Sequence, residues 1–375
     1  MNTPEPDPQP GEKISNAGKM QARQADPTPQ EGRPVRKSVR ESLKTMPHIP
    51  PEKVTVAIFC ALAHESVAVR YSLDEELNCR YKTIGPRSYI YSFGRIDDHH
   101  IVIARPTQMG PVSAASCAAT IHQQFPNIRF ALMVGIGAGI PSTEHDVRLG
   151  DIAVSIPHDG HPGVLQYDFG KYERDDQFVM KGTLNKPPQI LVNAVGSLEE
   201  DEMMDQSLLP ELLEDITKHR GYARPASQDI LFGPTFHHVN NGDDDCSGCL
   251  AASDKIVVSR PEREQDGGQP VVHRGLILSG GGVIKNPNDR SRFCRGQKDA
   301  ICFEMEAAGI ADEVPCLVVR GICDYADTHK QNSWQFYAAA VAAAYAKAIL
   351  LKFESPEVEE MVTMRALVPE SEWIA

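Results

Sequence analysis

Residues 301–327 have the sequence ICFEMEAAGIADEVPCLVVRGICDYAD, and this stretch decides the fold class. Its segments ICFEM (301–305) and CLVVRGIC (316–323) are apolar and partly β-branched, as expected of strands that are covered on both faces. The same stretch holds glutamates, aspartates and an arginine among Ile, Phe, Met, Val and Cys. Ionised groups in buried surroundings are costly unless something pairs with them, so these charges call for a functional explanation.

The rest of the chain alternates strands with helices. Further strands are predicted at 53–62, 89–96, 99–106, 130–140, 151–156 and 271–284, the second and third joined by the turn DDHH. Helices are predicted at 64–78, 111–125, 185–204, 207–220 and 333–353. We take Ser333 as the N-cap of the last helix. This alternation predicts an α/β fold with a mainly parallel or mixed sheet and helices on both faces.

Composition changes mark the boundaries of the folded region. Residues 1–52 carry scattered Pro, Gln, Lys and Glu without an apolar period, which predicts a disordered N-terminal tail. The domain is expected over 53–352, with a loop-rich insertion at about 236–270, where NNGDDDCSGCLAASD and REQDGGQP are typical of exposed loops. A polar tail is expected from 353 to 375.

Charge and cysteine content narrow the class of partner. The 375 residues include 38 basic and 51 acidic side chains, a formal net charge of -13, which argues against nucleic acid or an anionic membrane as a partner. No apolar run approaches the ~20 residues of a membrane span, and the polar N-terminus does not resemble a signal peptide. Nine cysteines, several in apolar patterns, indicate reduced thiols. We therefore expect a cytoplasmic protein with a small-molecule ligand.

The charged residues follow predicted strands. Glu65 comes just after the first strand, the glycine-rich VGIGAG (134–139) ends a central one, EME (304–306) closes a late one, and Arg320 and Asp324 close the next. Ligands of open α/β sheets bind at the carboxyl ends of strands, and glycines let the backbone approach a ligand closely. These groups are therefore expected to converge on one crevice.

The order of these motifs resembles the nucleoside phosphorylase superfamily, and within it most closely the 5′-methylthioadenosine/S-adenosylhomocysteine nucleosidases and related fungal nucleosidase domains. The resemblance covers about 53–352 and rests on CFEMEAAGIA with PCLVVRGICDYAD, together with GIGAG, VRLGDIAVS and GLILSGGGVI. It implies a single α/β domain whose twisted mixed sheet is partly closed like a barrel and flanked by helices. It also implies a homodimer or a larger homo-oligomer.

The resemblance assigns roles to residues. Asp324 would protonate or hydrogen-bond N7 of a purine, Glu306 and the Met305 backbone would hold the ribose hydroxyls, and Glu65 would position the attacking water with Arg320 close by. The remaining pocket residues implied are Gly135, Ile136, Gly137, Val283 and Phe303. The 5′ side of the substrate would be bound by the loosely patterned region 157–270, often with help from a neighbouring subunit.

The nucleophile is predicted to be water. Hexameric phosphorylases carry an arginine and a serine for phosphate where this chain has Met133 and Ile136, and a further arginine near the place of Glu65. A glutamate among apolar residues is a poor phosphate site. The nucleosidases carry a serine near the water, where this chain has Ile136. This difference affects how the water would be positioned.

We therefore predict a purine nucleoside N-ribosylhydrolase that needs no metal or cofactor, acting on adenosine first, with inosine and guanosine as further candidates. A phosphate-dependent purine nucleoside phosphorylase is one alternative. Another is a module that senses nucleosides or cleaves a nucleotide such as ATP, since the family occurs fused to fungal immune-like receptors. The chain has no P-loop of the form GxxxxGK[ST], which favours a stand-alone enzyme.

Three features also have plainer interpretations. Glu304 and Glu306 alone could be favourable charges at a helix N-terminus. Cys246 and Cys249 form a CxxC, but a structural zinc needs four ligands and no second CxxC follows, so a loop with free thiols is preferred over a metal held with His237, His238 or Asp245. The segment PHDGHPG (157–163) is either part of the pocket wall or a surface turn.

Overall fold

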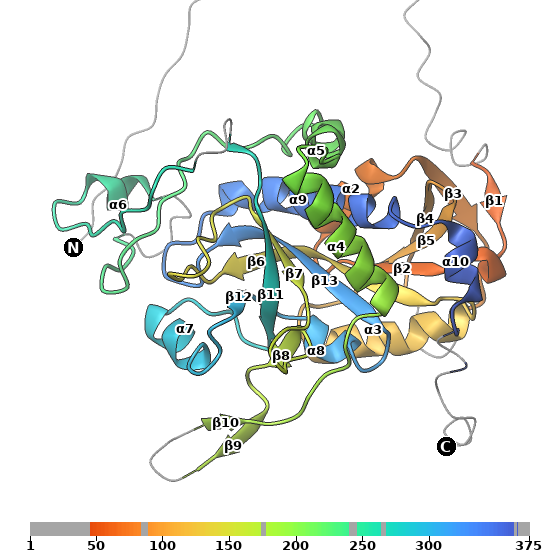
Figure 1. Cartoon of the computed structure of the whole chain (residues 1–375), viewed down its shortest axis with the longest axis horizontal. Helices are drawn as coiled ribbons and strands as arrows, with labels where there is room; N and C mark the ends of the chain where they lie inside the picture. The colour runs from red at the N-terminus through yellow and green to blue at the C-terminus, as the bar shows by residue number, and fades with distance from the viewer. Residues whose placement is uncertain are drawn as a thin grey trace, which may run out of the picture. The chain divides into compact units, whose positions relative to one another are not determined.

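The computed structural model describes residues 46–83, 89–173, 178–239, 246–263, 268–363 and 366 (Figure 1). Most of the predicted N-terminal tail and the end of the C-terminal tail lie outside these residues. Within 46–52, strand β1 (His48–Ile49) and the 3₁₀ helix η1 (Pro51–Lys53) are formed, so secondary structure begins earlier than the predicted boundary at 53. In the described part of the chain, no helix is long and apolar enough to cross a membrane.

Five strands close on themselves in the way the family resemblance implied. They are β6 (Phe130–Gly139), β7 (Ile152–Ser155), β11 (Val272–Ser279), β12 (Ala300–Glu304) and β13 (Cys316–Asp324). They pair in the order β6-β12-β11-β7-β13, and β13 pairs back onto β6 in parallel, with Arg320 opposite Gly135. The predicted α/β fold with a partly closed mixed sheet is confirmed.

Beyond β6 the sheet continues as an open, unclosed part. Its strands are β2 (Val56–Phe59), β5 (His99–Ala104), β4 (Ser92–Ile96), β3 (Glu75–Cys79) and β1, in that order. Strand β8 (Val164–Gln166) adds to β11, while β9 (Gly170–Tyr172) and β10 (Phe178–Met180) form a separate pair. Strands β2 and β6 run in parallel with all or nearly all of their side chains buried, as their apolar sequences predict.

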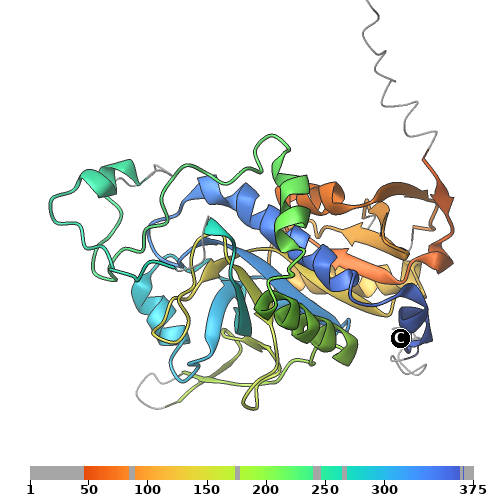
Figure 2. The ribbon, with the colours of Figure 1, turned by 45° about the horizontal axis from the view of Figure 1, so that its top comes forward.

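Helices cover both sides of the sheet (Figures 1 and 2). Helix α9 (Gln335–Leu350) is almost wholly buried and packs on β13, with α2 (Ala63–Ser72) and α5 (Leu209–Thr217) against it. Helices α3 (Pro111–Gln124) and α8 (Ala307–Ile310) pack together on the other side. The remaining helices are α4 (Gln189–Met203), α6 (Ser247–Ala251), α7 (Pro287–Phe293), α10 (Ser355–Glu360) and η4 (Asn332–Trp334).

Several predicted boundaries were wrong. The helix expected over 64–78 ends at Ser72, because the next residues turn into β3, which buries Leu77 and Cys79 between its neighbours. Ser333 is not the N-cap of α9, since it lies within η4 and its Oγ is 3.2 Å from Ser227 Oγ. The strand predicted to reach 284 ends at Ser279.

Two segments predicted to lack regular structure contain helices. The described part of the loop predicted at 240–254 includes α6, which buries Cys249 completely. The tail predicted from 353 includes α10, which buries Val358 against the main core. In each case a few apolar side chains find a partner surface that their local sequence does not reveal.

Candidate active site

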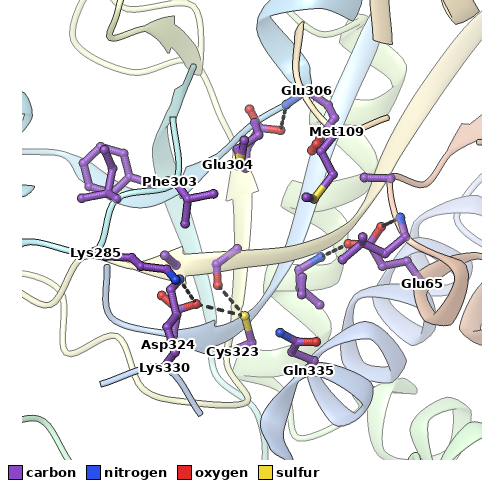
Figure 3. A pocket seen from close by; sticks show the side chains of 18 of the residues that line it. Glu65, Met109, Lys285, Phe303, Glu304, Glu306, Cys323, Asp324, Lys330 and Gln335 are labelled. Carbon is purple, nitrogen blue, oxygen red and sulfur yellow. Dashed lines mark hydrogen bonds and ion pairs between the residues drawn. The ribbon is translucent and has the colours of Figure 1, made fainter. Parts of the chain in front are cut away.

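A cavity of about 350 Å³ opens at the carboxyl ends of the central strands (Figure 3). Its described walls come from the β2–α2 junction, the end of β6, the loop after β11, the ends of β12 and β13, and the start of α9. The residues that line it are Ala61, Leu62, Glu65, Met109, Ile136, Gly137, Ala138, Gly282, Val283, Ile284, Lys285, Phe303, Glu304, Met305, Glu306, Cys323, Asp324, Lys330, Asn332 and Gln335.

Glu65 is fixed at one end of this cavity by backbone groups. It lies in the first turn of α2, where the Leu62 N–H donates to Oε2 at 2.7 Å and the Ile136 N–H donates to Oε1 at 2.8 Å. Its side chain is buried, and burial raises the pKa of Glu65, opposed by the positive charge of Arg320. The result is a rigid carboxyl group that accepts protons more readily than a surface glutamate.

Arg320 lies behind the cavity wall rather than in it. Its guanidinium is 1% exposed, donates to both Glu304 and Glu306, and has Nη1 4.0 Å from Glu65 Oε1. The distance to Glu306 Oε2 is 3.0 Å. Arg320 therefore holds three carboxylates in place, one from α2 and two from the junction of β12 and α8, and it acts as a positioning residue.

Gly135 makes room for this ion cluster. A Cβ at this position would lie 2.4 Å from Arg320 Nη1 and 2.5 Å from Glu65 Oε1. Gly135 does not line the cavity. It was predicted as a pocket residue, and the structure places it one layer behind, where its missing side chain admits the Arg320–Glu65 pair.

Glu306 and Met305 line the wall between β12 and α8. Glu304 accepts hydrogen bonds from the backbone N–H groups of Glu306 and Ala307 at the start of α8, while Glu306 Oε1 accepts from Gly110 N–H at 3.4 Å. Burial, together with the charges of Glu304 and Glu65 and against that of Arg320, raises the pKa of Glu306 to about 7. Glu306 therefore accepts a proton more readily than a surface glutamate.

Asp324 lies at the opposite end of the cavity, at the end of β13 (Figure 3). Its Oδ1 accepts from Ala326 N–H at 2.9 Å, and its Oδ2 contacts Lys330 Nζ at 2.5 Å. Burial alone would lower the pKa of Lys330, but Asp324, Cys323 and Asp327 together outweigh burial and raise it. Lys330 was not among the predicted site residues, although its place six residues after Asp324 in the same loop is a signal that the sequence contains.

The cavity thus brings together eight of the ten predicted site residues: Glu65, Ile136, Gly137, Val283, Phe303, Met305, Glu306 and Asp324. Gly135 and Arg320 support it from behind. The lining residues Met109, Lys285, Lys330, Asn332 and Gln335 were missed, three of which follow Asp324 closely in sequence.

The region 157–270 contributes less than the resemblance implied. None of its described residues lines the cavity. His158 and His161 pair across a short turn of their own, and neither borders the cavity, so PHDGHPG is a surface turn rather than part of the wall.

Family comparison agrees with this geometry. The family model described as the phosphorylase superfamily matches residues 55–353. The chain belongs to the phosphorylase superfamily. The resemblance read from the EME and RGICD motifs is thereby confirmed, and the matched region contains every residue of the candidate site.

Relatives of this superfamily chain fall into two groups. A nucleotide-binding leucine-rich repeat (NLR)-like protein from Hyaloscypha variabilis is 39% identical over 326 residues, which are 85% of this chain and 31% of the relative. The chain thus spans about a third of that relative's length. A 5′-methylthioadenosine/S-adenosylhomocysteine nucleosidase from Mycobacterium bovis is 21% identical over 302 residues, covering 79% of this chain and 96% of the relative.

Solved structures share the fold at low sequence identity. The 5′-methylthioadenosine/S-adenosylhomocysteine nucleosidase from Neisseria meningitidis, in complex with methylthio-immucillin-A, aligns with a TM-score of 0.51 at 16% identity, over 80% of this chain and 99% of that one. Futalosine hydrolase from Helicobacter pylori aligns with a TM-score of 0.50 at 15% identity, over 80% and 98%. At such identities the match concerns the fold.

Proposed function

We propose that this superfamily member is a purine nucleoside N-ribosylhydrolase that releases free base and ribose. The observation that carries the proposal is the arrangement of Glu65, Glu306 and Asp324 around one cavity, with Asp324 at the end opposite Glu65. Such spacing suits a nucleoside, whose base and sugar need different partners. The nucleosidases among the relatives support the same class of substrate.

The reaction follows from these positions. The bond between C1′ and the base nitrogen breaks with its electron pair leaving on the base. Asp324 protonates or hydrogen-bonds N7 of the purine, and the Lys330 ammonium that contacts Asp324 is the source of the proton. Glu306 and the Met305 backbone hold the ribose hydroxyls, and the carboxylate stabilises positive charge on the sugar. Water adds to C1′ and gives its proton to Glu65, which burial makes a better base.

Water is favoured over phosphate because the described residues that line the Glu65 end of the cavity include no cation. Among the described residues that line the cavity, the cationic ones are Lys285 and Lys330, and Lys330 is bound to Asp324. Arg320 is engaged by Glu304 and Glu306 and shielded from the cavity. An incoming phosphate would meet carboxylates instead of the Arg forks and helix N-termini that phosphate sites use.

The NLR-like relative favours a second candidate. Because the chain matches about a third of that protein, the same domain occurs there as one part of a larger chain. A domain of this kind would act as an effector that cleaves a nucleotide such as ATP, or as a sensor that binds without turnover.

Base release separates these candidates. Purified protein is incubated with adenosine, inosine, guanosine, uridine, methylthioadenosine and ATP, and free base is measured by chromatography beside Asp324→Asn and Glu65→Gln. We expect base from purine nucleosides, lost in both variants. Base from ATP alone would make the domain a nucleotide-cleaving effector. Binding of a nucleoside by calorimetry without any base release would contradict hydrolysis and leave a sensor.

A further inference from the structure

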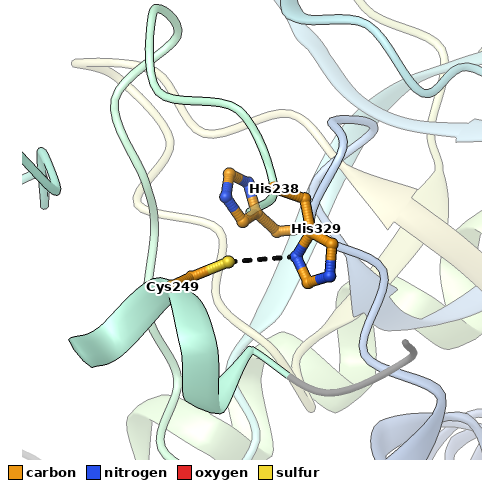
Figure 4. A group of neighbouring side chains, drawn as sticks. All are labelled: His238, Cys249 and His329. Carbon is orange, nitrogen blue, oxygen red and sulfur yellow. Dashed lines mark hydrogen bonds between the residues drawn. The ribbon is translucent and has the colours of Figure 1, made fainter. Parts of the chain in front are cut away.

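Four side chains with soft or imidazole ligand atoms meet outside the candidate active site. His238 comes from the segment before α6, Cys249 from the middle of α6, and His329 from the loop after β13 (Figure 4). Cys246 precedes α6 as its N-cap, with its Sγ 3.8 Å from His238 Nδ1. The CxxC of the insertion thus gains two histidines. His329 lies far along the chain, which is why the sequence alone supplied too few ligands.

The distances among His238, Cys249 and His329 are compatible with a tetrahedral zinc site, and the fourth ligand atom, Cys246 Sγ, would close on this group when the ion binds. Zinc bound to two sulfurs and two nitrogens, at about 2.3 Å and 2.0–2.1 Å, places its ligand atoms about 3.3–3.8 Å apart. His238 Nδ1 lies 3.0 Å from Cys249 Sγ and 3.8 Å from Cys246 Sγ. The ligand atoms of His238, Cys249 and His329 all lie within 4.8 Å of one another.

Burial and hydrogen bonding leave Nε2 of His329 available to bind a metal ion. His329 is 4% exposed, and its Nε2 has no hydrogen-bond partner among the described residues. Its Nδ1 faces the Asp327 carboxylate, with Nδ1 to Oδ1 at 3.7 Å. A carboxylate on the far nitrogen of a metal-binding histidine is the usual arrangement that orients the ring.

The surroundings provide a reason for a metal. Phe232 and Phe236 stack on the His329 ring, with centroids 4.1 and 5.5 Å away. With Cys246 and Cys249 these two phenylalanines form a separate small core. So few apolar side chains hold a segment weakly, whereas a bound zinc contributes folding free energy directly.

We propose that His238, Cys246, Cys249 and His329 bind one structural zinc ion. Binding releases the two thiol protons to solvent, so that two thiolates balance the charge of Zn²⁺ and the buried site is neutral. All four ligand positions are filled by protein, which makes the site closed and structural rather than catalytic. His237, the neighbour of His238, is exposed and takes no part.

The zinc site would connect the insertion at 236–270 to the loop after β13, which carries His329 and Lys330. His329 immediately precedes Lys330, whose ammonium contacts Asp324. The backbone N–H of His238 donates to Thr328 Oγ1 at 3.0 Å, so the insertion already touches this loop. Zinc binding would therefore fix the loop that positions Lys330 and, through it, one oxygen of Asp324. This consequence rests on the proposed function, whereas the metal site does not.

Metal content tests the site without any turnover. The full-length protein is purified without chelators from zinc-supplemented culture, and zinc is measured by plasma mass spectrometry. We expect about one zinc per chain, lost in Cys249→Ser and in His329→Gln. His237→Gln and Cys294→Ser are the matched controls and should retain it. In Asp327→Asn, competition with a chromogenic chelator should show zinc affinity reduced about 10–100-fold.

Cobalt substitution gives a second measurement on the wild-type protein. Co²⁺ bound by two thiolates in a tetrahedral site produces intense visible and thiolate charge-transfer absorption, which zinc then displaces. The proposal is overturned if the wild-type protein holds no zinc and shows no such absorption with Co²⁺. It is equally overturned if Cys249→Ser and His329→Gln retain zinc at the wild-type level.

Discussion

The substitution Gly135→Ala tests whether the Arg320 cluster depends on an absent side chain. The new Cβ would lie 2.4 Å from Arg320 Nη1 and 2.5 Å from Glu65 Oε1. Ordinary van der Waals contact begins at 3.4 Å, so the two groups must retreat by 3.4 − 2.4 = 1.0 Å and 3.4 − 2.5 = 0.9 Å. Neither can swing into solvent, because both side chains are buried at 1% exposure.

Two effects of known size follow from this displacement. Overpacking in a filled interior costs about 1–3 kcal/mol of stability. A misplacement of about 1 Å in a catalytic group costs roughly 10²-fold in rate. We therefore expect Gly135→Ala to lower the free energy of unfolding by about 1–3 kcal/mol and kcat/KM by about 10²-fold.

Urea unfolding and steady-state base release measure both effects. Gly196→Ala is the matched control, because Gly196 lies within α4 with no heavy atom within 4 Å of its added Cβ, and alanine there should stabilise by about 0.5–1 kcal/mol. The account of the ion cluster is refuted if Gly135→Ala unfolds within about 0.5 kcal/mol of wild type and keeps its kcat/KM.

Three further predictions concern β13 and Glu306. Gly321→Ala places a Cβ 1.9 Å from the Ala338 carbonyl oxygen of α9 and should destabilise by about 3 kcal/mol or more in urea unfolding. Asp324→Asn should lower kcat about 10²- to 10⁴-fold with unchanged circular dichroism. Because the pKa of Glu306 is raised from 4.5 to about 7, the folded state binds this proton more tightly than the unfolded state. Its contribution to stability is therefore full below pH ~4.5 and lost as pH rises through ~7, by up to about 3 kcal/mol, and Glu306→Gln should remove this slope.

The fold could be predicted because most of its strands have apolar sequences that are recognisable without tertiary information. The segments that became β2, β6 and β13 are mostly apolar, with β-branched residues among them, and are buried on both faces. Strand β3 was missed because EELNC holds two glutamates and an asparagine, and only Leu77 and Cys79 are buried. Its identity as a strand comes from pairing with β4 and β1, which is a tertiary property.

The candidate site could be predicted in part for the same reason. Side chains at strand ends, such as Glu65 and Asp324, converge because parallel strands end at one edge of the sheet. The position of Arg320 behind the cavity wall could not be deduced, since it depends on how Glu65 of α2 and the segment with Glu304 and Glu306 pack around the guanidinium. His329 was missed for a related reason, because nothing in the local sequence links it to the CxxC.

The identity of the nucleophile tests the central claim most directly. Wild-type protein is incubated with adenosine in phosphate-free buffer and again with added phosphate, and the sugar product is identified by mass spectrometry. Since the described residues that line the cavity beside Glu65 include no cation, and Arg320 is bound to Glu306 behind the wall, we expect free ribose at the same rate in both buffers. Ribose 1-phosphate formed only with phosphate would contradict it and show that Arg320 or a lysine of the cavity releases its carboxylate to bind the anion.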